Sequence, residues 1–336
     1  MILHPGILAL LLGSALVLLL LLQSARIALK ILCRWNPLVA DEGQLSLERS
    51  TYLVSTLVNY ALAFTVLSLP LFLYTLDDLH PLFTGAMCAT GSLNANPIGW
   101  LALLCKLLLA FLAGFWILLN HYDLQAEDYP LVRLKYLLLL CLLPLVGADL
   151  YLQANYFLGL EPEIITSCCG SLFSLGAGGV AGEVSSWPPG TMMVLFFSGA
   201  AGYLGLLVVN LYSRLPFMRY LLGLFASLFL LLGMAAIVSF VSLYVYELPT
   251  HHCPFDMLQK SSNFIGYPIF FTLFATCFCG VVPAILERMR RLASLEPIAS
   301  RAQGYWLRMA VLFLSLYVLL SSWPILFSDL TLKAYF

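Results

Sequence analysis

The sequence predicts an all-α integral membrane protein with about eight transmembrane helices. Three observations lead to this fold class: an apolar composition, eight long apolar runs, and basic residues that recur in every second connection. Hydrophobic residues make up 62% of the 336-residue chain and charged residues only 10%, whereas soluble domains carry about 25% charged residues. Such a chain cannot bury its apolar surface in one aqueous globule, so we expect the lipid bilayer to be its solvent.

Each apolar run is long enough to cross a bilayer, which takes about 20 helical residues. Because backbone amides cannot stay unpaired in lipid, every run is expected to be α-helical. No soluble domain of useful size remains between the runs, which predicts a single polytopic membrane domain over residues 1–336. The runs lie near residues 5–25, 52–75, 98–120, 135–158, 191–212, 219–246, 264–286 and 307–328.

Basic residues are distributed unequally between the two sides of this predicted bundle. One side, reached after the first, third, fifth and seventh helices, holds thirteen Lys and Arg, and the opposite side holds two. By the positive-inside rule the thirteen are cytoplasmic, which places both termini and the cysteine loops outside. The thirteen are Arg26, Lys30, Arg34, Arg49, Arg133, Lys135, Arg214, Arg219, Arg288, Arg290, Arg291, Arg301 and Arg308, and the two are Lys260 and Lys333.

The N-terminal residues MILHPG lack the basic segment of a cleavable signal peptide. We therefore expect the helix within 1–34 to remain as a reversed anchor. The whole pattern predicts a multi-pass protein of a bacterial inner membrane, with its cysteine loops on the periplasmic side.

The chain is similar to itself when it is shifted by 84 residues, from 135 to 219. KYLLLL at 135–140 then lies over RYLLGL at 219–224, and EIITSCC at 163–169 lies over ELPTHHC at 247–253. Leucine-rich helices align by chance, but ordered Glu, Thr and Cys matches indicate an internal repeat. We expect helices two to seven to form three tandem hairpins, at 49–120, 133–214 and 217–291, flanked by helices within 1–34 and 305–336.

The repeat makes three cysteines equivalent. Cys169 corresponds to Cys253, and a looser first copy, which begins with RSTY at 49–52, reaches Cys88 after a comparable length. Repeats in one orientation imply a pseudo-symmetry axis along the membrane normal. We therefore expect these thiols at similar heights on the outer face, with Cys168 as an additional thiol.

The outer thiols Cys88, Cys168, Cys169 and Cys253 are the candidate catalytic or structural groups. In an oxidising compartment such cysteines tend to form disulfides, and four cysteines allow three pairings. Two structural disulfides that clamp the outer loops are therefore one interpretation.

A soft-metal site is a second interpretation of the same atoms. Thiolates with neighbouring imidazoles suit Cu(I) or Zn(II), although no CxxC or HxxxH spacing is present. Adjacent residues cannot all reach one ion, so ligands from several loops are required. The candidate metal ligands are His80, Cys88, Cys169, His251, His252 and Cys253.

Thiol–disulfide exchange is a third interpretation. An imidazolium beside a cysteine lowers the thiol pKa and increases the thiolate fraction, and His252 precedes Cys253. Cys168 or Cys169 would then resolve the mixed disulfide. This chemistry is similar to that of membrane disulfide-forming proteins of the quinone-linked and vitamin K epoxide reductase kinds, whose CxxC motif is absent here.

Other ligands and partners are less favoured. Haem and quinone rank below copper and zinc, since no CxxCH motif occurs and the outer histidines lie in loops or near helix ends. A net charge of −1 argues against nucleic acid, and the glycine-rich segment 170–190 lacks the GK[ST] of a nucleotide-binding loop. The expected partners are the lipid bilayer and a membrane or periplasmic protein.

Two charged residues lie within the apolar runs. Lys106 is about eight residues into the third helix from the outer side, and Asp149 is about ten residues before the outer end of the fourth, so both sit at a similar depth. Intramembrane charges are costly and usually pair or line a path. We expect a buried Lys106–Asp149 ion pair.

These patterns favour a membrane protein with an extracytoplasmic Cys/His site for thiol–disulfide exchange or soft-metal handling. The alternative is a non-catalytic subunit of a larger transport or electron-transfer complex, whose cysteines form structural disulfides. The sequence contains no motif that assigns an enzymatic reaction.

Overall fold

The computed structural model describes residues 3–35, 42–126, 128–161, 165–166, 187–213 and 215–330. Within these ranges the regular structure is helical, apart from an isolated bridge between Thr84 and Ile165. Among the described residues, eight helical spans are long and apolar enough to cross a membrane. The predicted all-α class and the predicted number of spans are therefore confirmed.

The α-helices of the described chain form eight membrane-length spans and one short helix, α3. A π-helical turn, Ile237–Val241, joins α8 to α9, so that Pro216–Tyr246 forms one span. The bounds are α1 (Pro5–Arg34), α2 (Glu42–Leu79), α3 (Ala89–Asn94), α4 (Gly99–Asp123), α5 (Val132–Leu158), α7 (Pro189–Tyr212), α8 (Pro216–Ala236), α9 (Ser242–Tyr246), α10 (Gly266–Met289) and α11 (Glu296–Phe327).

Proline begins several of these helices. Pro5, Pro189 and Pro216 occupy the first turn of α1, α7 and α8, where the missing N–H would lack an intrahelical acceptor in any case. Three helices extend well beyond their predicted apolar runs, since α1 continues to Arg34, α2 begins at Glu42 and α11 begins at Glu296. Hydropathy locates only the part of a helix that lies in lipid, whereas backbone hydrogen bonding continues into adjoining polar residues.

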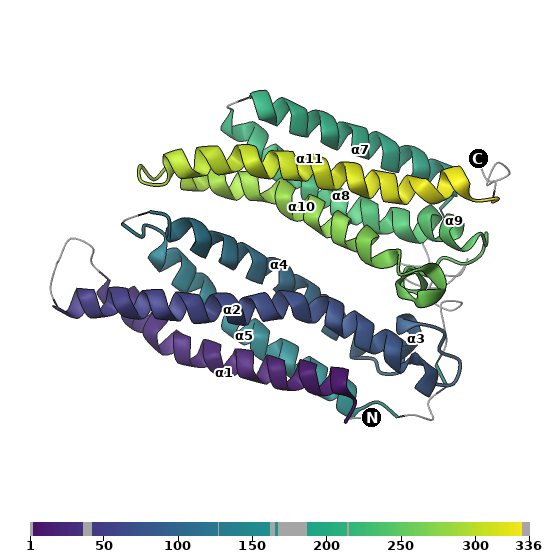
Figure 1. Ribbon diagram of the computed structural model, residues 1–336, viewed down its shortest axis with the longest axis horizontal. Coiled ribbons are helices and arrows are strands. Elements are labelled where there is room, and N and C mark those ends of the chain that lie inside the picture. The colour runs from purple at the N-terminus through teal and green to yellow at the C-terminus, as the bar shows by residue number, and fades with distance from the viewer. Residues whose placement is uncertain are drawn as a thin grey trace. The chain divides into compact units, whose positions relative to one another are not determined.

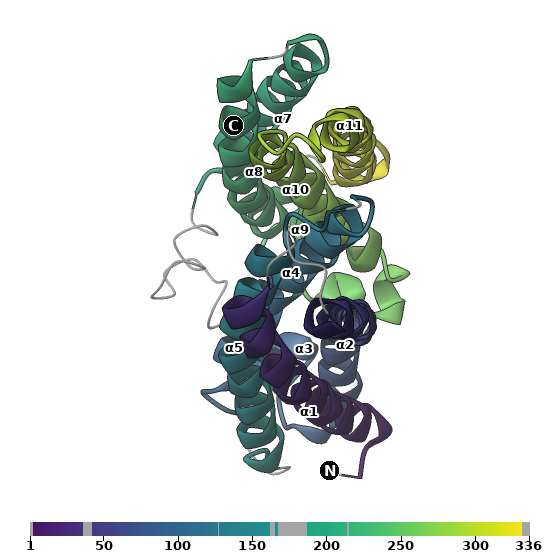
Figure 2. The ribbon, with the colours of Figure 1, turned by 90° about the vertical axis from the view of Figure 1, so that its left-hand side faces the viewer.

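The first compact unit contains Met1–Leu82, Ser92–Ile164 and Leu292–Ile298. Helices α1 and α4 each pack against both α2 and α5 (Figures 1 and 2). Side chains from all four helices fill the core between them. They include Val17, Leu21, Val58, Leu62, Leu109, Trp116 and Leu139.

The second compact unit contains Phe83–Gly91, Ile165–Arg291 and Ala299–Phe336. Here α8 packs against α7 and α10. Tyr203 of α7 donates a hydrogen bond to the carbonyl of Thr276 in α10 at 3.0 Å. Tyr317 of α11 donates to the carbonyl of Gly233 in α8 at 2.9 Å, so buried tyrosines tie the helices together.

Two of the expected hairpins correspond to helices that pack within one unit, α2 with α4 and α8 with α10. The helices of the remaining hairpin, α5 and α7, belong to different units. The two helices of the expected hairpin 133–214 therefore lie in different units and do not form a hairpin within one unit.

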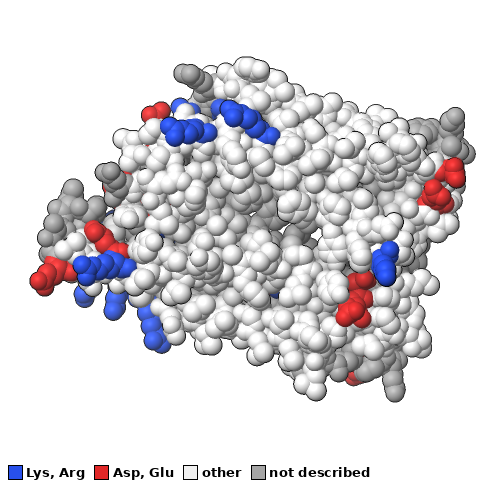
Figure 3. Space-filling model, viewed as in Figure 1, with Lys and Arg blue, Asp and Glu red and all other residues white. Residues whose placement is uncertain are grey.

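Exposed charge lies at helix ends. In the first unit, blue Lys and Arg side chains gather where α1 ends and α2 begins; in the second, they gather where α10 ends and α11 begins (Figure 3). The helical surface between the ends is nearly free of colour on this face. This is the distribution expected of helices whose middle parts lie in hydrocarbon.

Candidate functional site

Two of the candidate thiols lie side by side in the second unit. Cys88 immediately precedes α3, and Cys253 follows the histidine pair after α9. Their Sγ atoms are 3.5 Å apart, and both side chains are fully buried. The Thr90 hydroxyl lies 3.5 Å from the Cys253 sulfur, which makes this a small buried sulfur cluster.

A carboxylate completes the cluster. Among the described residues, Cys88, Cys253 and Asp256 form a group of three potential metal ligands whose donor atoms all lie within 4.8 Å of one another. Asp256 Oδ2 contacts His251 Nε2 at 2.7 Å. The other oxygen, Oδ1, is buried and accepts no hydrogen bond from the described residues, so its lone pairs are available to a cation.

The sulfur separation fits a metal ion. Two thiolates on a tetrahedral zinc ion, with Zn–S bonds of about 2.3 Å, lie about 3.8 Å apart. A disulfide bond requires about 2.05 Å. At 3.5 Å, the pair is close to the first arrangement and needs a larger movement to reach the second.

Hydrogen bonds fix the loop that carries Cys253. Tyr246 donates its hydroxyl proton to the Cys253 carbonyl at 2.9 Å. Gln259 donates from Nε2 to the carbonyl of Met87 at 2.7 Å, beside Cys88. The loop leaves α9 through Glu247, whose φ of 56° is left-handed, a conformation that turns the chain sharply. Met257, on the turn Asp256–Leu258, is fully buried.

The two neighbouring histidines have different roles. His251 contacts Asp256, and its ring lies edge-on to Tyr246 with centroids 4.7 Å apart. His252 Nδ1 donates to the carbonyl of Val238 at 3.0 Å, within the π-helical turn. Burial lowers the pKa of His252 below its ordinary value, and the nearby His251 lowers it further, against the raising effect of the Val238 contact. The neutral imidazole is thus favoured and places no positive charge beside Cys253.

The remaining candidate ligands lie elsewhere. His80 belongs to the first unit, where its ring Nδ1 contacts the carbonyl of Asp77. Cys168 and Cys169 lie outside the described residues. The described chain therefore brings together Cys88 and Cys253 from the expected set, with His251 attached through Asp256.

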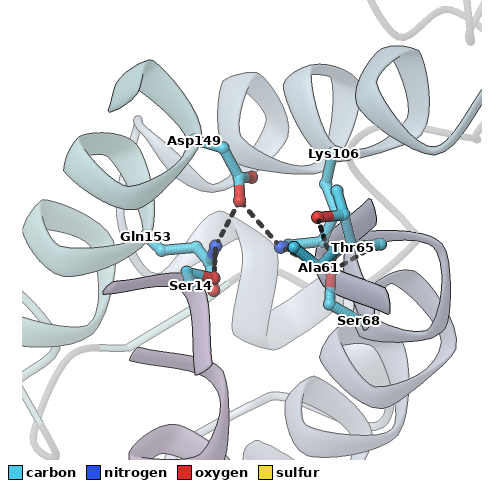
Figure 4. Close-up of polar contacts among 7 residues, drawn as sticks. All are labelled: Ser14, Ala61, Thr65, Ser68, Lys106, Asp149 and Gln153. Carbon is cyan, nitrogen blue, oxygen red and sulfur yellow. Dashed lines mark hydrogen bonds and ion pairs between the residues drawn. The ribbon is translucent and has the colours of Figure 1, made fainter. Parts of the chain in front are cut away.

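A second polar cluster lies inside the first unit, in the membrane-spanning part (Figure 4). Lys106 of α4 donates to Asp149 Oδ2 of α5 at 3.1 Å and to the Ser68 hydroxyl of α2 at 3.2 Å. Gln153 donates to the same Asp149 oxygen at 2.6 Å and to Ser14 of α1 at 3.2 Å. All four helices of the unit thus meet at one charge-neutral cluster.

A further buried ion pair joins the same two helices. Lys135 of α5 lies 2.8 Å from Asp123 Oδ2 of α4 and donates to Asn120 at 3.1 Å, and both charged side chains are fully buried. Each helix thus contributes a lysine followed by an aspartate, and antiparallel packing places each lysine beside the aspartate of the other helix. Two pairs of this kind hold an antiparallel helix pair in one register.

Sequence reasoning missed two of these residues. Asp256 follows Cys253 by three positions with Pro254 between them, and proline at the second position is typical of a β-turn, which brings its first and fourth residues together. Asp123 ends α4, and Lys135 lies in the first turn of α5 after a short connection. These opposite charges at the adjoining ends of two consecutive helices could have predicted the Asp123–Lys135 ion pair from the sequence.

No protein-family model matches this chain, and no curated protein or solved structure shows significant similarity to it.

Proposed function

We propose that this membrane protein binds a soft or borderline metal ion, copper(I) or zinc(II), through Cys88 and Cys253 with Asp256 as a third ligand. The observation that carries the proposal is the group itself: two buried sulfurs 3.5 Å apart and a carboxylate within 4.8 Å of both. The buried Asp256 Oδ1, which accepts no hydrogen bond from the described residues, supplies the negative charge that a cation requires.

Binding changes the protonation of the site. Thiolates, not thiols, are the ligands, so each cysteine releases a proton when the ion enters. Zinc would take the carboxylate readily, whereas copper(I) would rely on the two sulfurs. His251 contacts Asp256 Oδ2 and would hold the carboxylate in place, which is the orienting role that outer groups play around metal sites.

The burial of both sulfurs favours metal binding over thiol exchange with another protein. A thiolate must reach a disulfide sulfur to exchange with it, and neither Cys88 nor Cys253 is exposed. The neutral state of His252 also removes the imidazolium that would activate Cys253.

The site's side of the membrane is part of the same proposal. The excess of basic residues at the opposite helix ends supports a cytoplasmic location for those ends and a periplasmic location for the metal site in a bacterial inner membrane. The triplicated hairpin, in which Cys88 and Cys253 are equivalent positions, belongs to the same proposal and is supported by the sequence matches. Cys169 is the third equivalent position and would be an additional ligand.

A structural disulfide between Cys88 and Cys253 is the second candidate. Their burial and proximity suit a bridge formed by an oxidant of the disulfide or quinone class, which takes up two electrons and two protons. The protein would then be a non-catalytic membrane subunit whose loops are clamped together.

Elemental analysis together with thiol trapping on the purified chain tests both candidates. Metal binding predicts about one copper or zinc ion per chain, trappable thiols after denaturation, and loss of the ion in Cys88→Ser and Cys253→Ser. Cys33→Ser removes an exposed thiol and is the matched control. A metal-free chain whose mass is lower by two hydrogens, with Cys88 linked to Cys253, would establish the disulfide and overturn the metal site.

A further inference from the structure

A cluster of charged side chains lies in the second unit, at the end where α8 begins and α10 ends. Arg219 is in the first turn of α8 and is 7% exposed. Its Nη2 donates to the carbonyl of Ser213 at 3.3 Å. Its Nε and Nη1 are buried and have no hydrogen-bond acceptor among the described residues, although charged donors removed from water normally have one.

The nearby carboxylate is already engaged. Glu287 accepts hydrogen bonds from Arg290 at 3.1 Å and from Gln303 at 2.8 Å. The charges of Glu287 and Arg290 both act on Arg219. Arg219 donates a hydrogen bond to neither residue in the described structure. Nε of Arg290 is a third buried donor that has no acceptor.

The cluster therefore carries an excess of positive charge. Two arginines against one glutamate leave a net charge of +1 in a largely buried position. Uncompensated buried charge is costly, and three guanidinium nitrogens of Arg219 and Arg290 remain available as donors. The Lys106–Asp149 pair of the first unit differs in this respect, because it is neutral by itself.

The position of the cluster indicates the class of anion. Arg219 lies three residues after α8 begins and Arg290 directly follows α10, so both lie at the ends of membrane-spanning helices. Phospholipid phosphates lie at this level of a membrane, and basic pockets between helices there bind lipid headgroups. Arg290 is 25% exposed and reaches the surface, and three further exposed arginines add to the local field: Arg288, Arg291 and Arg308.

We propose that Arg219 and Arg290 form a binding site for a phosphate group, supplied by the headgroup of an anionic phospholipid. The buried donors of the two guanidinium groups hold the phosphate oxygens, and Glu287 with Gln303 holds Arg290 in place. Guanidinium groups are well suited to this task because they present several donors to phosphate oxygens. The site is separate from the sulfur cluster and does not depend on the metal proposal.

Lipid retention by the delipidated full-length chain in detergent tests this site. Native mass spectrometry would count bound phosphatidylglycerol and, in a parallel titration, phosphatidylcholine. We expect one phosphatidylglycerol to be retained by the wild type, and Arg219→Gln to weaken its binding about tenfold, as the loss of a charge-assisted hydrogen bond predicts. Arg301→Gln removes an exposed charge and should change binding by less than about twofold.

Thermal unfolding separates a binding site from a structural role. Phosphatidylglycerol should raise the unfolding midpoint of the wild type and of Arg219→Lys, which keeps the charge, but not that of Arg219→Gln. If inorganic phosphate alone produces the shift and Arg219→Gln abolishes it, the source is free phosphate and the site stands. Equal lipid retention in Arg219→Gln and the wild type would overturn the proposal, as would equal losses in Arg219→Gln and Arg301→Gln.

Discussion

The Sγ atoms of Cys88 and Cys253, which are 165 positions apart in the chain, lie 3.5 Å from each other in a fully buried position. No local feature of the sequence requires this contact. It depends on tertiary packing, which brings the segment before α3 against the loop after α9 within the second unit. Asp256 adds a carboxylate to the pair, so that three potential metal ligands lie within 4.8 Å of one another.

Asp256→Asn is predicted to weaken metal binding while leaving both thiols in place. The change removes the negative charge beside the sulfurs, and we expect a loss of affinity of about 10–100-fold, comparable to other losses around metal sites. Competition with a chelator of known affinity measures it. His251→Gln keeps the carboxylate and should lose less metal affinity than Asp256→Asn. Asp329→Asn, at an exposed position of the same unit, should bind the metal as tightly as the wild type. Unchanged affinity in Asp256→Asn would remove this residue from the ligand set.

Breaking the Lys106–Asp149 pair should destabilise the first unit. Lys106→Met leaves Asp149 as an unpaired charge in the membrane-spanning part, at a cost of about 3–5 kcal/mol in the free energy of unfolding. The double variant Lys106→Met/Asp149→Leu removes both charges and should recover most of that loss. Denaturant unfolding in detergent measures the cycle.

Lys30→Met is the matched control for this cycle, because Lys30 is exposed near the end of α1. Its effect should stay within about 0.5 kcal/mol. If Lys106→Met lowers the free energy of unfolding no more than this control does, the Lys106–Asp149 pair does not contribute to stability in detergent.

His252 makes the second unit sensitive to acid. Its pKa is lowered in the folded chain by burial, whereas an unfolded histidine titrates near about 6.5. Below that pH the unfolded state binds more protons than the folded state, so the free energy of unfolding falls as the pH falls and is restored as the pH rises above it. His252→Gln should reduce this dependence, as measured by unfolding midpoints between about pH 5 and 8. An identical pH profile in the variant would show that His252 does not contribute.

Gly280 is required for the close approach of α10 to α7 and α8. A Cβ at this position would collide with the Tyr203 hydroxyl and lie 2.7 Å from the Ala226 Cβ. Displacing Tyr203 breaks its hydrogen bond to Thr276, so Gly280→Ala should cost about 1–3 kcal/mol. Gly205→Ala is the control, because nothing lies within 4 Å of the added carbon and alanine favours helix by up to about 1 kcal/mol. Similar midpoints for both variants would contradict this packing.

Much of the membrane architecture could be read from residue patterns. Length and hydropathy of each run are local properties, and they predicted the eight spans because lipid requires an apolar helix of nearly constant length. Counting residues also predicted a common depth for Lys106 and Asp149, since the rise per residue in a helix is constant. Helix ends were predicted less well, as α2 and α11 show, because the polar first turns carry no hydropathy signal.

The candidate site could be predicted only in part. Residue type singled out Cys88 and Cys253, but Asp256 had no distinguishing pattern beyond its distance from Cys253 and the intervening Pro254. The neutral state of His252 depends on burial against the π-helical turn, which lies 14 positions away. Neither relation is visible in the order of residues.

The sequence by itself determined that this protein is helical, crosses the membrane and places charge at the ends of its helices, because these properties follow from short stretches meeting lipid or water. The tertiary structure alone decided which side chains meet: Cys88 with Cys253, Lys135 with Asp123, and Arg219 near Glu287. Such contacts depend on how helices pack against one another. Packing is set by the shapes of many side chains together, which hydropathy does not record.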